Sequence, residues 1–126
     1  MMLMLLVSTN VLAVDWVKIV ENDAVTGYID TQSIRRNGNK VRAWTLKNYK
    51  SGQVGAANNK IYLSAIIRSE YDCFEDTKRD IDIYAYSGTM GAGDIVFSAP
   101  NITKPAISAP PESDIEAVLK MVCVTK

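Results

Sequence analysis

One stretch of alternating residues constrains the fold more than any other part of this chain. From Ile61 to Cys73 the sequence reads IYLSAIIRSEYDC, and apolar and polar positions alternate along most of it. A period of two predicts a β-strand with one buried side, because successive side chains point to opposite faces of a sheet. The residues expected on the buried side are Ile61, Leu63, Ala65, Ile67, Ser69, Tyr71 and Cys73.

Five further segments have the composition of strands and are separated by turn residues. They are Asp15–Val20, Ala24–Asp30, Lys40–Lys50, Lys78–Tyr86 and Asp94–Ser98. In Lys78–Tyr86 the alternation places Ile81 and Ile83 inward and Asp80 and Asp82 outward. Together the segments predict an antiparallel sheet of about five to six strands.

The connections between these strands are predicted to be short. Asp30 is expected to cap a helical turn, and Asn37-Gly38 is a strong turn signal because both residues tolerate positive φ. Ser51–Asn59, rich in Gly, Asn and Ala, is expected to be a loop. Gly88–Gly93 contains a GxG, but no helix follows it, so it predicts a hairpin turn rather than a phosphate-binding loop.

A helix is predicted at the C-terminus. Ser113 and Glu116 have the spacing of a capping box, in which each side chain bonds a backbone N–H at the helix start. One apolar stripe with helical spacing follows, formed by Ile115, Val118, Leu119, Val122 and Cys123. The predicted fold is therefore α+β, an antiparallel sheet packed by a C-terminal α-helix.

The N-terminus has the pattern of an export signal. An apolar run opens the chain, and small residues follow at Val11-Leu12-Ala13, so residues 1–13 are predicted to be a signal peptide and Val14–Lys126 a single domain. Oxidising compartments preserve disulfides, and the two cysteines allow one pairing, Cys73 with Cys123. The alternative is a pair of free buried thiols.

Composition argues against several functional classes. The 126 residues include no histidine, the commonest general base and zinc ligand, and the formal net charge is zero. We therefore expect no enzyme, no metal, no cofactor and no nucleic-acid partner. The acidic group Asp72, Glu75, Asp76, Asp80 and Asp82 fits no calcium-loop spacing. The opening apolar run is far shorter than the ~20 residues of a membrane span.

Basic residues concentrate in the first half of the chain. Every charged residue from Thr31 to Ser69 is Lys or Arg, whereas acids dominate from Glu70 to Asp94. One interpretation is a basic stripe that binds an anionic protein or glycan partner. The candidate residues are Arg35, Arg36, Lys40, Arg42, Lys47 and Lys50. The other interpretation is that basic and acidic strands are neighbours and pair across the sheet.

Several ordered motifs carry a family resemblance. They are Tyr28-Ile29-Asp30, WTLKNY at Trp44–Tyr49, Glu70-Tyr71-Asp72-Cys73, and Val122-Cys123 in the terminal helix. In this order they resemble the surface-adhesin protein E family, small exported domains of Gram-negative bacteria. The Pro-rich segment Asn101–Pro111 departs from the pattern, since the resemblance leads one to expect a tryptophan there.

The resemblance implies a sheet backed by a C-terminal helix, with bridged cysteines. For the best-known member it also implies homodimers and binding of host matrix and serum proteins at the cell surface. We therefore expect a non-catalytic exported binding module in the periplasm or at the outer cell surface. The alternative is a periplasmic structural or inhibitory partner of an envelope protein.

Overall fold

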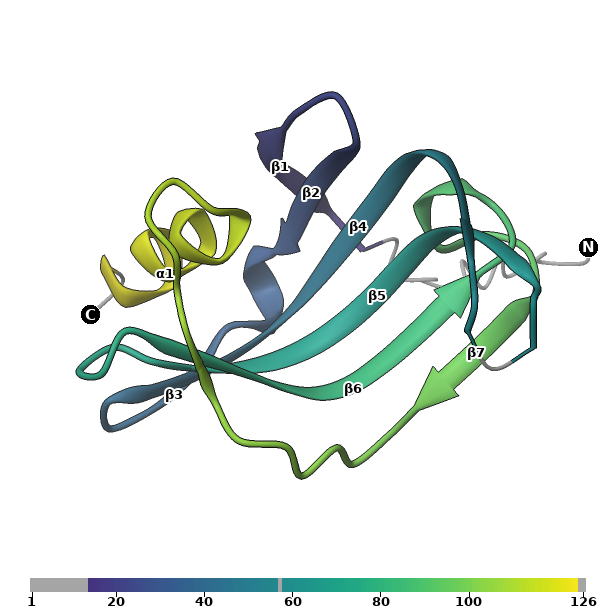
Figure 1. Ribbon diagram of the computed structural model, residues 1–126. Helices are drawn as coiled ribbons and strands as arrows, with labels where there is room; N and C mark the ends of the chain where they lie inside the picture. Colours follow the sequence, from purple (N-terminus) through teal and green to yellow (C-terminus); the bar gives the residue numbers. More distant parts are fainter. Residues whose placement is uncertain (1–13, 57, 125–126) are drawn as a thin grey trace, which may run out of the picture.

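An antiparallel sheet and one helix make up the structure, a computed structural model that describes residues 14–56 and 58–124 (Figure 1). The described elements are β1 (Trp16–Glu21), β2 (Val25–Asp30), the 3-10 turn η1 (Thr31–Ser33), β3 (Arg35–Asn37), β4 (Lys40–Val54), β5 (Ile61–Asp72), β6 (Thr77–Tyr86), the 3-10 turn η2 (Thr89–Gly91), β7 (Ile95–Ala99), β8 (Ile107–Ser108) and α1 (Asp114–Val124). The α+β class is confirmed. Its sheet has eight strands over the described residues, more than expected. The predicted signal peptide, residues 1–13, lies outside the described part.

The sheet order is β1-β2-β4-β5-β6-β7, with β3 beside β4 and β8 beside β6. Figure 1 shows α1 over one end of the curled sheet and β7 at an edge; the segment between them continues from the end of β7 past β6 and then rises to α1. Directly paired residues share a face of an antiparallel sheet. Val41 pairs with Tyr71 and marks the helix face, whereas Arg42 pairs with Glu70 and marks what we call the open face.

The main core lies between α1 and the helix face. Its buried members are Ile29, Val41, Ala43, Tyr71, Val118, Leu119 and Val122. Burying each large aliphatic side chain among them stabilises the fold by about 1.5–3 kcal/mol. The predicted disulfide is present: Cys73 and Cys123 are bonded, with Cα atoms 5.5 Å apart. It ties the end of β5 to the last turn of the helix.

The start of α1 follows the predicted capping box in part. The Ser113 hydroxyl accepts a hydrogen bond from the Glu116 N–H at 3.1 Å. The Glu116 carboxylate reaches back one residue further than expected and accepts from the Glu112 N–H at 3.4 Å. Lys47 of β4 pairs with Asp114 at 3.2 Å, so the first turn of the helix is also held to the sheet.

The open face is covered at one end by η2, which folds back from the β6–β7 connection. Ser64 donates to the carbonyl of Gly88 at 2.7 Å and accepts from the N–H of Gly91 at 2.9 Å. The φ of Gly91 is +74°, which favours glycine, and a Cβ there would lie 2.8 Å from Ile66 Cδ1, so the end of the Ile66 side chain would have to shift as well. Leu46 is fully buried beneath the turn.

The predicted loop Ser51–Asn59 is wrong in its first part. β4 continues to Val54, which pairs with Ile61 at the end of a long hairpin. Ile61 is consequently 60% exposed rather than buried. The short strands β3 and β8 were also absent from the sequence prediction.

The predicted outward position of Asp80 is wrong because of a β-bulge. Arg68 pairs with Asp82 and the next residue, Ser69, pairs with Asp80, so Ile81 is an extra residue in β6. The extra residue shifts the alternation. Asp80 therefore lies on the helix face, where its carboxylate accepts a hydrogen bond from Ser69 at 2.8 Å, and Asp82 lies on the open face.

Candidate functional site

The uncovered part of the open face carries a group of charged and aromatic side chains from three adjacent strands. We call this group the open-face cluster. Its members are Arg42 and Trp44 of β4, Arg68 and Glu70 of β5, and Arg79, Asp82 and Tyr84 of β6. The cross-strand register aligns Arg42, Glu70 and Arg79 in one row.

Glu70 lies at the centre of three cations. Its carboxylate is 3.0 Å from Arg42 Nε, 3.4 Å from Arg79 Nη2 and 3.7 Å from Lys40 Nζ. Partial burial raises the pKa of Glu70, but the hydrogen bonds from Arg42 and Arg79 outweigh burial and hold the pKa below its ordinary value. The carboxylate is therefore ionised at neutral pH and fixes both guanidinium groups in place.

Asp82 fixes a second arginine. Its carboxylate accepts from Arg68 Nε at 2.7 Å and from the Asn101 N–H at 3.0 Å. The backbone hydrogen bond from Asn101 is the largest cause of the lowered pKa of Asp82, and burial opposes it in part. The Arg68 guanidinium lies 5.6 Å from the centroid of the Trp44 ring, a cation–π distance.

The aromatic side chains give this region a rigid floor. The rings of Trp44 and Tyr84 stack with centroids 6.4 Å apart and an interplanar angle of 25°. Such pairs contribute about 0.5–1.5 kcal/mol beyond the area that they bury. Arg68 therefore stands between a fixed carboxylate and a fixed aromatic surface.

A hollow of about 260 Å³ opens beside Trp44, where η1 and β3 flank the sheet. Its lining residues are Ser33, Arg35, Arg42, Ala43, Trp44 and Arg68. Ser33 accepts a hydrogen bond from the Trp44 N–H at 2.9 Å, which holds η1 against β4. Arg35 Nη1 donates to the carbonyl oxygens of Gln32 and Ile34 at 2.8 and 2.9 Å. Three guanidinium groups beside an indole ring can bind a sulfate or carboxylate together with an apolar or planar group.

The structure separates the six predicted basic residues into two sets. Arg35 and Arg42 line the hollow, with Lys40 next to them beside Glu70. Arg36 alternates with Arg35 on β3 and pairs with Val41, so it lies toward the other side of the hairpin. Lys47 and Lys50 lie further along β4, paired with Asp114 and Glu21.

Cross-strand pairing, the alternative interpretation of the charge pattern, is confirmed for Lys40, Arg42 and Arg68. The six candidate residues did not include Trp44, nor Arg68, which belongs to the same basic segment of the sequence. Only the register of β4 against β5 brings these two residues together, since Trp44 pairs directly with Arg68. The alternation of apolar and polar residues does not predict this register.

The acidic residues of the second half are dispersed among these contacts. Asp80 and Asp82 lie on opposite faces and pair with Lys78 and Arg68. Within the described ranges, no three acidic, cysteine or histidine side chains gather in a way that could hold a metal ion. The described helices include none that is long and apolar enough to span a membrane.

The structure is thus a small α+β domain, in which a curled antiparallel sheet is joined by a disulfide to one terminal helix and carries half-buried arginine and tryptophan side chains on its open face. Residues 16–124 match the family model described as surface-adhesin protein E, and the chain belongs to that family. It is accordingly an adhesin-like surface binding module, and membership points to a non-enzymatic protein of the bacterial surface.

Solved structures of protein E from Haemophilus influenzae have the same fold. One, of the selenomethionine form, is 19% identical with a TM-score of 0.65, and the match covers 87% of this chain and 86% of that chain. Another, from non-typeable Haemophilus influenzae, is 18% identical with a TM-score of 0.61, and the match covers 86% of this chain and 75% of that chain. No curated protein matches the sequence.

Proposed function

We propose that this chain is an exported module that binds an anionic partner through the arginine–tryptophan hollow of its open face. The partner would present sulfate or carboxylate groups, as sulfated glycans and acidic protein segments do. The observation that carries the proposal is the convergence of Arg35, Arg42 and Arg68 on one hollow beside Trp44.

The charge balance around the hollow supports an anionic ligand. Glu70 is shared among three cations, so it cannot neutralise all of them. Arg35 contacts backbone carbonyls, and no carboxylate among the described residues lies within ion-pair distance of it. This surface therefore has an excess of positive charge that is already ordered, which favours anion binding because little side-chain entropy remains to be lost.

Binding of heparin fragments to the exported chain tests this proposal directly. We expect binding that weakens as salt rises from 50 to 300 mM and that changes the fluorescence of Trp44, because exposed charges are screened by salt. Arg35→Glu should weaken binding by about five- to tenfold through lost attraction and added repulsion.

Lys60→Glu is the matched control, because Lys60 is an exposed cation outside the hollow. It makes the same change in net charge and should alter binding less than about twofold, as expected of a distant screened charge. Equal effects of the two variants, or no binding of heparin, laminin or vitronectin, would count against the proposal.

The second candidate function is that of a periplasmic structural or inhibitory partner of an envelope protein. The ordered, ion-paired character of the open-face cluster favours it, since a folded partner surface could dock there without rearrangement. Crosslinking in the native envelope distinguishes the two: this alternative predicts one dominant envelope protein and no affinity for host proteins. The homodimer implied by the family resemblance stays a prediction, which light scattering of the purified chain tests.

A further inference from the structure

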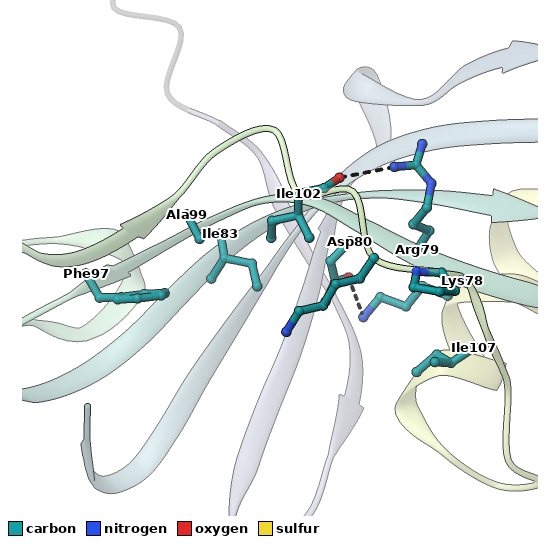
Figure 2. Close-up of a pocket in the computed structure, with 10 residues that line it drawn as sticks. Lys78, Arg79, Asp80, Ile83, Phe97, Ala99, Ile102 and Ile107 are labelled. Carbon is teal, nitrogen blue, oxygen red and sulfur yellow. Dashed lines mark hydrogen bonds and ion pairs between the residues drawn. The ribbon is translucent and has the colours of Figure 1, made fainter. Parts of the chain in front are cut away.

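A cavity of about 360 Å³ lies on the helix face, at the edge where β7 ends (Figure 2). The segment after β7 first follows β6, and the Ile102 N–H donates to the Ile81 carbonyl at 2.7 Å. The segment rejoins β6 at Ile107, which pairs with Lys78. Between these two anchors it leaves the sheet, and Pro105 has no N–H to donate there. We call Ile102–Ile107 the strap.

The walls of this cavity are mainly apolar. Its apolar lining residues are Ile83, Phe97, Ala99, Ile102, Pro105 and Ile107. Ile83 pairs with both Ile67 and Ala99, which places this wall on the side opposite the arginine–tryptophan hollow. Phe97 is 40% exposed and Ile107 56% exposed, so apolar surface remains open to solvent here. The cavity shares no lining residue with the arginine–tryptophan hollow, although Arg79 belongs to both this cavity and the open-face cluster.

Three cationic side chains and one carboxylate complete the lining, namely Lys78, Arg79, Lys104 and Asp80. The carboxylate is already engaged, since Asp80 is 3.0 Å from Lys78 Nζ and accepts from Ser69 at 2.8 Å. Figure 2 shows Lys78 directed toward Asp80, whereas Arg79 turns away to the Ile102 carbonyl, 3.3 Å from its Nη1.

Lys104 differs from the other cations of the lining. It belongs to the strap, and the part of the chain that the structure describes has no carboxylate within ion-pair distance of its Nζ. An apolar cavity with one uncompensated ammonium group matches a ligand that has an apolar body and one negative charge. Such a ligand gains from both burial and Coulomb attraction.

We propose that this cavity binds a small single-chain amphipathic carboxylate of the medium-chain fatty acid class. The alkyl chain would lie against Ile83, Phe97 and Ile107, with the carboxylate at Lys104. Small-molecule pockets run from about 300 to 1,000 Å³, so this cavity accommodates one short chain and not a two-chain lipid. The inference does not depend on the anionic partner of the open face.

An NMR titration of the exported chain with decanoate, kept below its micelle concentration, tests the proposal. Methyl signals of Ile83, Ile102 and Ile107 should shift in a saturable manner, and the indole signal of Trp44 on the open face should not. Decyltrimethylammonium has the same chain and the opposite charge, and it should bind at least about fivefold more weakly, as loss and reversal of one ion pair predict. Hexanoate should also bind more weakly, because it buries fewer methylene groups.

Two variants locate the ligand. Lys104→Gln should weaken the binding of decanoate about three- to fivefold through the lost ion pair. Lys60 is an exposed lysine elsewhere, so Lys60→Gln should leave the binding of decanoate unchanged. Ala99→Leu fills the cavity beside Ile83 and should weaken the binding of decanoate more than about tenfold. No methyl shifts, equal binding of the cationic amphiphile, equal effects of the two lysine variants, or binding only to anionic phospholipid vesicles would each overturn the proposal.

Discussion

The apolar residues on the two faces of the sheet are covered by different elements. On the helix face, α1 covers the core across β1 and β4, and a covalent bond to Cys73 holds it there. On the open face, the short turn η2 covers Leu46, held mainly by hydrogen bonds to Ser64 and Asn48. The rest of that face is left to charged and aromatic side chains.

This difference shows where the protein can tolerate change. The covered end of the helix face depends on burial and on one disulfide, so substitutions there should lower the free energy of unfolding by a large amount. The open-face cluster depends on ion pairs that water partly screens. Substitutions there should therefore lower the free energy of unfolding only slightly and should weaken ligand binding more. Four measurements of unfolding test this contrast.

Removal of the disulfide is expected to have the largest effect. The bond closes a separation of 50 residues, and its loss in Cys73→Ser/Cys123→Ser should lower the free energy of unfolding by about 4 kcal/mol in the chain-entropy account. Urea denaturation of the variant and the oxidised parent measures this loss. A change below about 1 kcal/mol would mean that burial alone holds α1.

The turn over the open face should come next. Gly91→Ala places a methyl group 2.8 Å from Ile66 Cδ1 at a φ of +74°, and should cost about 2–3 kcal/mol in unfolding free energy. Gly38→Ala is the matched control: its φ is +64° but nothing lies within 4 Å of the added Cβ, so only the backbone cost of about 1 kcal/mol is expected. Equal losses in thermal or urea denaturation would show that η2 shifts without cost.

The ion pairs of the open face should contribute less, and in a pH-dependent way. The pKa of Glu70 is lowered in the folded state, so its contribution is present above the ordinary carboxyl pKa and is lost as pH falls through the folded value. Glu70→Gln should cost about 1–2 kcal/mol at pH 7 and should flatten the loss of stability below about pH 5.

Glu75→Gln, in an exposed turn, is the control for this pH dependence. It should retain both the stability at pH 7 and the acid slope of the parent. Urea denaturation between pH 3 and 7 gives both quantities for the two variants. An unchanged slope in Glu70→Gln would indicate that other carboxylates carry the acid sensitivity.

Exposed ion pairs should have the smallest effect. Lys120 lies 3.1 Å from Glu116 across one turn of α1, and its side chain is 75% exposed. Lys120→Gln should therefore change the free energy of unfolding by less than about 0.5 kcal/mol. A larger loss would mean that the helix surface depends on charge, contrary to the contrast drawn between the two faces.

Local patterns in the sequence predicted much of the fold. The alternation from Ile61 to Cys73 corresponds to β5, and the apolar stripe with Ser113 at its start corresponds to α1. These features depend on residues close together in the chain, so sequence periodicity can reveal them. The pairing of Cys73 with Cys123 followed because two cysteines leave one choice.

The sites depended on long-range geometry that periodicity cannot supply. The hollow forms because the register sets Trp44 opposite Arg68 and because Ser33 holds η1 against β4. The second cavity forms because the strap meets β6 at two separated points. Strict alternation also assumes a regular strand and so cannot predict a β-bulge. The prediction therefore placed Asp80 on the wrong face.

That bulge gives β6 a double role. Asp80 and Asp82 would share a side in a regular strand, yet Ile81 directs one to Lys78 near the strap and the other to Arg68 near the indole. A single inserted residue thus distributes negative charge between the two surfaces for which we propose ligands. In a relative without the insertion, both carboxylates would point the same way, and one of the two surfaces would lose its internal counter-charge.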